Sequence, residues 1–121
     1  MHESIVVVVV AGDRHTLVLD ASEVHMVEDA ALAGGAVRTL SDSDARRALL
    51  TARGWVIVDD RVVLRRIDRD AFLPMPAWLE RVQFPVRALV RIDEGFGCHI
   101  DIDRLFDGPF DFAQDRPDDG A

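Results

Sequence analysis

Residues 5–10 form an uninterrupted run of β-branched side chains, Ile5-Val6-Val7-Val8-Val9-Val10, and this run constrains the fold more than any other feature. β-Branched side chains lose rotamer freedom in a helix and are favoured in strands. A strand without polar alternation is typical of a sheet that is buried on both faces. Gly12-Asp13 then supplies a turn, and residues 15–20 resume the β pattern, so the sequence predicts a β-hairpin.

Two further hairpins are predicted from pairs of apolar runs that flank turn-forming residues. The first joins residues 55–58 to residues 61–67. The second joins residues 86–92 to residues 96–102. Residues 72–76 contain two prolines and are expected to be extended, because proline drives the residue before it out of the α region.

Short helices are expected between these strands. Residues 45–50 are strong helix formers preceded by Ser and Asp residues that favour a helix N-cap, and Gly54 stands where such a helix would end. Residues 77–82 follow a proline and predict one or two further helical turns. Residues 22–28 fit either a strand extension or a short turn of helix, and residues 30–40 are expected to form a loop.

About six strands in adjacent antiparallel pairs predict a mainly β fold with short helices. Small β-barrels or barrel-like sheets are expected, because they cover strand edges that would otherwise be exposed. The length of 121 residues suits a single domain, which we expect to span residues 1–106. Residues 107–121 carry five Asp and one Arg, which is typical of a disordered acidic tail. Within this tail, residues 109–117 resemble a translated repeat element from the ends of bacterial genes, which suggests read-through.

The net charge of −8 argues against polyanionic partners. An acidic surface repels phosphate backbones and anionic lipid headgroups, so neither nucleic acid nor a membrane surface is expected as a partner. The longest apolar stretch, residues 5–11, is far shorter than the ~20 residues of a membrane-spanning helix. The N-terminus lacks the basic segment of a signal peptide, and the single cysteine, Cys98, excludes an intramolecular disulfide. A cytoplasmic location is therefore expected.

One polar constellation stands out near the end of the domain. His99, Asp101 and Asp103 alternate with Cys98 and apolar residues, which on a strand would place the three on one face. We interpret them as a solvent-facing polar stripe, with a divalent metal or small-ligand site on this face as the alternative. Cys98 and His99 would point to opposite faces, so they are not expected to form a nucleophile pair. The residues indicate no catalytic group, metal site or cofactor.

Several parts of the chain resemble the CheW-like chemotaxis coupling domain. Residues 6–19 resemble the first hairpin of that family, and residues 23–27 resemble the step of two spaced valines that follows it. Residues 72–76, 86–93 and 100–105 are similar to the closing segment of the family. Thr51-Ala52-Arg53-Gly54 resembles a family step in which Arg-Gly precedes a strand.

The resemblance implies two interlocked SH3-like β-barrel subdomains, no enzymatic activity and no cofactor. It also implies an adaptor that links a histidine kinase to the cytoplasmic helices of receptors through mainly apolar contacts. By the same resemblance, Arg53 is expected to contact a helical partner, with Gly54 beside it and Val24 and Val27 as apolar contacts. Trp55 is a further candidate because Trp is common among residues that dominate interfaces, although it also suits a core position.

The sequence leaves three functions open. The first is a non-enzymatic signalling adaptor in a bacterial array. The second is a small β-rich metal- or ligand-binding protein that uses the face of His99, Asp101 and Asp103. The third is an accessory half-domain that works only within an oligomer or a larger complex.

Overall fold

A computed structural model describes residues 3–12, 15–41, 43–77, 85–93 and 95–108 of the chain. The strands are β1 (Ser4–Ala11), β2 (Thr16–Asp20), β3 (Met26–Asp29), β4 (Val37–Thr39), β5 (Arg46–Thr51), β6 (Gly54–Asp59), β7 (Val62–Asp68), β8 (Phe72–Leu73), β9 (Val86–Ile92) and β10 (Gly95–Ile100). The other described elements are the short 3-10 helices η1 (Ala21–Glu23), η2 (Ala30–Leu32) and η3 (Arg69–Ala71), and the α-helix α2 (Ile102–Asp107).

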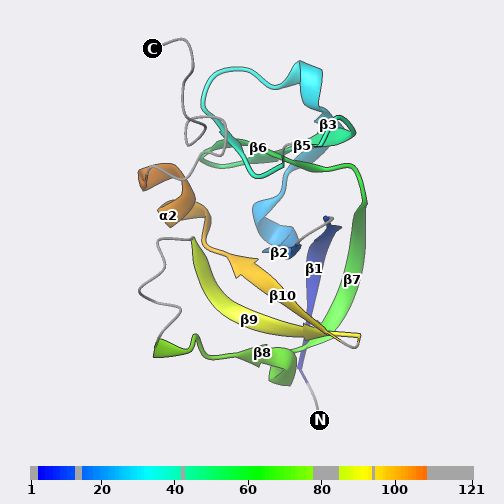
Figure 1. Ribbon diagram of the computed structural model, residues 1–121, viewed down its shortest axis with the longest axis vertical. Helices are drawn as coiled ribbons and strands as arrows, with labels where there is room; N and C mark the ends of the chain where they lie inside the picture. The colour runs from blue at the N-terminus through cyan, green and yellow to red at the C-terminus, as the bar shows by residue number, and fades with distance from the viewer. Residues whose placement is uncertain (1–2, 13–14, 42, 78–84, 94, 109–121) are drawn as a thin grey trace.

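The strands form two sheets, which lie at opposite ends of the view in Figure 1 with α2 beside them. The larger sheet has the order β7-β1-β2-β10-β9-β8, and the smaller has the order β3-β5-β6-β4. Pairing is parallel between β10 and β2 and between β4 and β6, and antiparallel in the other described pairs. The predicted mainly β fold is therefore confirmed.

The closed barrels expected from the sequence are not formed by the described strands. β7 and β8 stand at the two ends of the larger sheet, and β3 and β4 stand at the two ends of the smaller one. β8 has only two residues and pairs with β9. Both sheets are consequently open, and their apolar faces are covered by packing rather than by closure.

β1 is buried on both faces. Val7, Val8, Val9 and Val10 are all buried, with β2 on one side of the strand and β7 on the other. Val8 and Val10 belong to the core between the two sheets, and Val7 and Val9 belong to a second cluster on the opposite face of the larger sheet. The prediction of a doubly buried strand and of the β1–β2 hairpin is confirmed.

One hydrophobic cluster joins both sheets and α2. Its members come from β1, β2, β5, β6, β9, β10 and α2: Val8, Val10, Leu17, Leu19, Leu49, Val56, Val58, Val86, Ile100, Ile102, Leu105 and Phe106. Burial of apolar side chains is the main favourable term in folding, so this shared cluster holds the two sheets together.

The helix predicted over residues 45–50 is wrong, because residues 46–51 form β5 between β3 and β6. Ala48 and Leu49 point to opposite faces of this strand, and both are fully buried. Two hydrogen-bonded neighbours and burial on both faces outweigh the modest helix preference of Ala, Arg and Leu. The Ser residues before β5 accept backbone N–H groups of a turn instead of capping a helix.

The predicted pairing of residues 55–58 with residues 61–67 is also wrong, although both segments are strands. β6 pairs with β5 and β4, whereas β7 pairs with β1 in the other sheet. The chain at Asp60 thus crosses between sheets. The loop expected over residues 30–40 contains η2 and the short strand β4. Neighbours in sequence often pair, but local turn signals do not decide which sheet a strand joins.

The third predicted hairpin is confirmed as β9–β10, but its second strand is shorter than expected. β10 ends at Ile100, and the Asp101 carboxylate accepts the Arg104 backbone N–H at 3.2 Å as the N-cap of α2. Asp is favoured at this position because it satisfies a free N–H of the first helical turn. Asp103 therefore lies on a helix rather than on the predicted strand.

The remaining predicted segments are covered only in part. Residues 22–28 contribute to both η1 and β3. Beyond Ala77, the helix predicted over residues 77–82 lies outside the described residues, and so does the tail from residue 109 onwards. Among the helices that are described, none has the length and apolar character needed to cross a membrane.

Candidate functional site

An apolar groove of about 660 Å³ lies where the edge strand β3 of the smaller sheet approaches the edge strand β7 of the larger one. Its lining comes from β1, η1, the link to β3, β3, β5 and the start of β7: Val6, Val8, Ala21, Val24, His25, Met26, Val27, Arg47, Asp60, Val62, Val63 and Leu64. We call this surface the β3–β7 groove. Most of these residues are apolar, so the groove is suited to an apolar ligand or segment.

The floor of the β3–β7 groove is continuous with the hydrophobic core. Val8 is buried within the core cluster, and the half-buried Ala21, Val24 and Val62 pack against that cluster. A floor held by the core is preorganised, which lowers the entropic cost of binding.

The rim carries large side chains that the fold leaves in contact with solvent. Leu64 is 70% exposed, Val63 is 53% exposed and Met26 is 48% exposed, and Val6 and Val27 are exposed as well. Isolated exposed apolar residues are ordinary, but a contiguous group of them around a concave surface marks an interaction site. Met26 adds an unbranched thioether that adapts to differently shaped ligands.

Polar atoms in the groove come from three side chains. His25 follows Val24, Arg47 lies near the start of β5, and Asp60 lies between β6 and β7. A few polar groups in an apolar groove orient a ligand rather than supply most of its affinity. The β3–β7 groove therefore offers an apolar contact area with both charge signs at its margin.

Val24 and Val27, two of the five predicted site residues, both line this groove, and their contact with a partner stays a prediction. The other three predicted site residues lie elsewhere. Arg53 and Gly54 form the β5–β6 turn beside α2. Trp55 pairs with Leu50 next to the core residues Leu49 and Val56, so Trp55 points to the outer face of the smaller sheet. The five residues do not form one surface.

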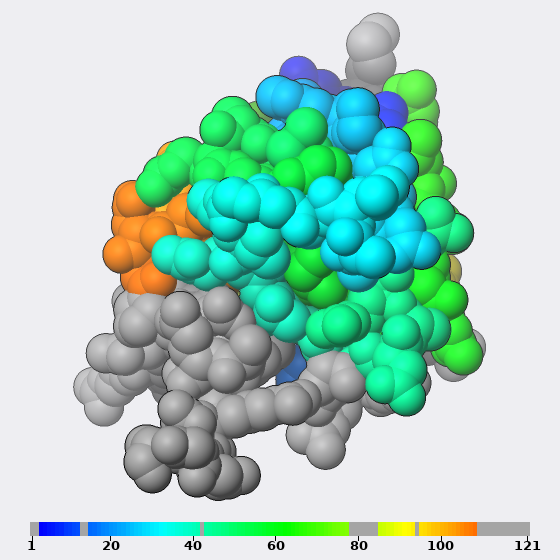
Figure 2. All heavy atoms as spheres, turned by 90° about the horizontal axis from the view of Figure 1, so that it is seen from above, coloured from blue at the N-terminus to red at the C-terminus, as the bar shows by residue number. Residues whose placement is uncertain are grey.

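Seen from above in Figure 2, the segment between β3 and β5 lies over much of that outer face, with α2 to one side. Trp55 is half-buried, and its backbone N–H donates to the Ala36 carbonyl at 2.9 Å. The contact of Trp55 with a partner remains a prediction.

Arg53 is engaged with the protein's own helix. Its guanidinium donates to Asp103 at 2.9 Å and to Asp107, and it lies 6.0 Å from the centre of the Phe106 ring. The hydrogen bond with Arg53 is the largest influence on the pKa of Asp107 and lowers it. Arg38 adds hydrogen bonds to the last carbonyls of α2, at 3.2 Å to Leu105 and 2.9 Å to Phe106. Arg53 thus fastens α2 to the β5–β6 turn.

His99, Asp101 and Asp103 do not form a solvent-facing stripe on one strand, because β10 ends at Ile100 and Asp103 lies on α2. The predicted stripe and the alternative metal site are both corrected. His99 is buried and contacts Asp20 of β2, with 3.0 Å between its Nε2 and the carboxylate. Burial is the main cause that lowers the pKa of His99, while Asp20 opposes it. Within the described ranges, no group of three His, Cys, Asp or Glu side chains is arranged to hold a metal ion.

Cys98 packs against the core cluster, and burial raises the pKa of its thiol. A protonated thiol is a poor nucleophile, so this position suits packing rather than catalysis.

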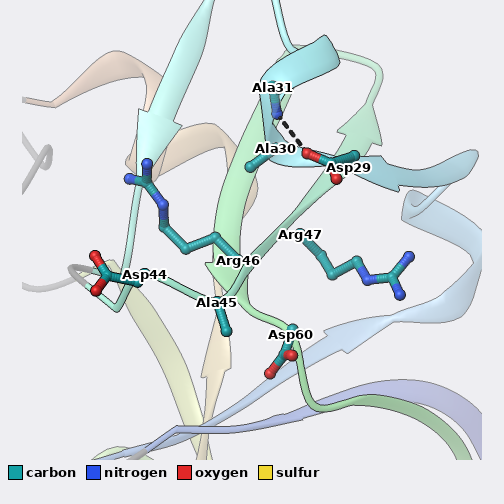
Figure 3. Close-up of a pocket in the computed structure, with 8 residues that line it drawn as sticks. All are labelled: Asp29, Ala30, Ala31, Asp44, Ala45, Arg46, Arg47 and Asp60. Carbon is teal, nitrogen blue, oxygen red and sulfur yellow. Dashed lines mark hydrogen bonds between the residues drawn. The ribbon is translucent and has the colours of Figure 1, made fainter.

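A second hollow, of about 470 Å³, is polar and lies at the start of β5 (Figure 3). Arg46 and Arg47 extend in opposite directions there, and the carboxylates of Asp44 and Asp60 lie well apart. The Asp29 carboxylate accepts the Ala31 backbone N–H at 2.9 Å. These groups do not converge on a common point, so the hollow is a weaker candidate than the β3–β7 groove.

Several residues that line the groove were not among the site residues predicted from the sequence. Val63 and Leu64 are predicted only as strand residues, and Met26 lies in a segment that fits either a strand or a turn of helix. The available signal was the unbroken apolar run of residues 62–64 on a strand that also carries charged residues. Asp20 and Arg87, which surround His99, are 67 residues apart in sequence, so no local pattern could join them.

Comparison with known proteins identifies the fold. No protein-family model matches the sequence, and no curated protein matches it. Among solved structures, the scaffolding protein TtCheW from Thermoanaerobacter tengcongensis aligns with a TM-score of 0.64 and 17% sequence identity. The alignment covers 81% of this chain and 89% of that protein. The chain therefore has the fold of a CheW scaffolding protein.

Proposed function

We propose that the protein is a non-enzymatic signalling adaptor that binds an apolar segment of a protein partner in the β3–β7 groove. The observation that carries this proposal is the contiguous exposed apolar lining around Val63, Leu64 and Met26, set on a floor continuous with the core. The CheW-like fold supports a scaffolding role of this kind. The partners proposed from the resemblance are a histidine kinase and the cytoplasmic helices of receptors.

An amphipathic helix fits these features. Such a helix places apolar side chains on one stripe, which can lie along an apolar groove, while its charged flank meets polar groups at the margin. Arg47 and Asp60 lie at the margin of the β3–β7 groove and would contact the charged flank of the helix. Val24 and Val27 would contact the apolar stripe.

The test is direct binding to purified partners. The full chain is titrated with a fluorescently labelled receptor cytoplasmic helical segment, and separately with a histidine kinase, both from the organism that encodes this protein. Leu64→Asp places a charge in the groove and is expected to weaken binding at least tenfold, which corresponds to about 1.4 kcal/mol.

Leu32→Asp is the matched control, because Leu32 is 65% exposed and does not line the groove. Its affinity should stay within about twofold of the natural chain. Equal losses in the two variants, or no binding to either partner, would contradict the proposal.

Arg53→Ala belongs in the same assay as a probe of the contact expected from the resemblance. If Arg53 contacts the partner directly, Arg53→Ala weakens binding, whereas Asp107→Asn, which releases Arg53 from one of its own carboxylates, does not. Similar losses in both variants would indicate that Arg53 acts only by holding α2.

A further inference from the structure

Glu23 lies at the point where the chain passes from one sheet to the other. It is the last residue of η1, which follows β2 of the larger sheet and precedes β3 of the smaller one. The next residue, Val24, forms part of the floor of the β3–β7 groove and packs against the core. The backbone N–H of Val24 donates to the Ala21 carbonyl across η1 at 3.2 Å.

One carboxylate oxygen of Glu23 is buried without a hydrogen-bond partner. Within the part of the chain that the structure describes, Oε1 of Glu23 is the buried side-chain polar atom that lacks such a partner. A buried oxygen that carries negative charge and accepts no hydrogen bond is costly, and proteins normally pair or neutralise it.

The charged surroundings of Glu23 are mainly acidic. Asp20 of β2, Asp101 at the N-cap of α2 and Asp103 of α2 all act on it electrostatically. His99 of β10 is committed to Asp20 by its 3.0 Å contact.

Arg87 of β9 is the cation that acts on Glu23. Its guanidinium lies 4.0 Å from the carboxylate of Asp20 and 3.7 Å from that of Asp101. The positive charge of Arg87 is thus shared with Asp20 and Asp101, which approach it within ion-pair distance. It therefore compensates the negative charge of Glu23 only in part.

These groups favour a proton on Glu23. Burial is the largest cause that raises the pKa of Glu23 above its usual range, repulsion from Asp20 adds to it, and Arg87 opposes it. Protonation removes the buried charge and, with it, the repulsion from the neighbouring carboxylates.

We propose that Glu23 is a proton-sensitive switch in the link between the two sheets. In the protonated state Glu23 is held among the acidic groups, and η1 and Val24 are fixed in the groove floor. In the ionised state Glu23 is repelled from this cluster, and the link loosens. The part of this inference that concerns binding rests on the proposed function of the β3–β7 groove, whereas the titration and the loosening do not.

The test follows carboxyl and methyl signals by NMR on the full chain. The chain has five Glu, so ¹³C-labelled glutamate gives a small set of carboxyl signals, and Glu23→Gln assigns the one of interest. We expect the Glu23 carboxyl to titrate above the usual range of a glutamate carboxyl, and the methyl groups of Val24 to shift with the same midpoint.

Three variants separate Glu23 from its neighbours. Glu23→Gln should abolish the methyl midpoint and hold Val24 in its low-pH position at all pH values, whereas Glu28→Gln should leave the midpoint in place. His25→Gln removes the imidazole next to Val24 and should also leave the midpoint unchanged. A Glu23 carboxyl that titrates in the usual range of a glutamate, or a methyl midpoint that persists in Glu23→Gln, would overturn the proposal.

Partner binding provides the linked readout. If the groove binds the receptor segment, its affinity for the natural chain should fall at least threefold as pH rises through the Glu23 midpoint, and should not do so for Glu23→Gln. An intact NMR titration without partner binding would count against the proposed function alone. Partner binding without the titration would count against the switch alone.

Discussion

Gly54 shows how a single residue without a side chain permits the packing of α2 against the smaller sheet. Its φ of +145° lies in a region that residues with a side chain rarely adopt. A Cβ at this position would lie 2.5 Å from the Ala36 carbonyl oxygen and 2.9 Å from the Phe106 ring. Thr51 shapes the same turn, since its Oγ1 accepts the Gly54 backbone N–H at 3.2 Å.

Gly54→Ala is expected to lower the free energy of unfolding by about 2 kcal/mol or more, because backbone strain and the clash add together. Urea denaturation measures this change. Gly34→Ala is the matched control, since nothing lies within 4 Å of an added Cβ there, and its effect should stay within ~0.5 kcal/mol. Equal losses in the two variants would contradict this account.

His99 is a buried titratable residue, and burial disfavours its protonated, charged form. Because burial holds the pKa of His99 below its usual 6.5, the unfolded chain binds a proton here more readily than the folded chain. The contribution of His99 to stability is therefore complete above pH 6.5 and is lost as pH falls through its folded pKa.

His99→Gln removes this titration while retaining an amide donor for Asp20. We expect the natural chain to lose stability relative to His99→Gln as pH falls from 7.5 to 5, because the other acid-sensitive groups, Glu23 included, are common to both. Urea midpoints at the two pH values give this difference directly. A constant difference between the two proteins across the range would show that His99 does not titrate in this way.

At the scale of elements, β5 demonstrates that position in a sheet overrides intrinsic preference. Its residues favour a helix, yet the strand lies between β3 and β6 and contributes Leu49 to the core that joins the sheets. The neighbouring Leu50 points to the other face and is half-buried. The two leucines therefore differ in environment although they are adjacent in sequence.

Leu49→Ala should lower the free energy of unfolding by about 2–5 kcal/mol, as expected for a cavity in a well-packed core. Leu50→Ala should cost roughly 1 kcal/mol, because its side chain is partly exposed in the folded state. Chemical denaturation of the two variants tests this ranking. A helix over residues 45–50 would not produce this alternation between adjacent positions.

At the scale of the whole molecule, the two sheets share one hydrophobic core. The core cluster takes residues from both sheets and from α2, and the chain passes between the sheets at η1 and again at Asp60. Neither sheet can lose its partner without exposing the cluster.

We therefore expect both sheets to unfold in a single cooperative transition. Native-state hydrogen exchange measures this, with the buried Val9 of β1 and the buried Val58 of β6 reporting on the two sheets. Their limiting free energies of opening should agree within about 1 kcal/mol. A clearly lower value for one of them would indicate that its sheet opens independently.

The sequence by itself determined those features that depend on neighbouring residues. The β-branched run of β1, its hairpin with β2 and the β9–β10 hairpin follow from side-chain type and nearby turns. Only the tertiary structure decided that β5 is a strand, that β6 and β7 belong to different sheets, and that His99 is buried against Asp20. These features depend on burial and on partners distant in sequence, whose energies exceed the local preferences from which a sequence is interpreted.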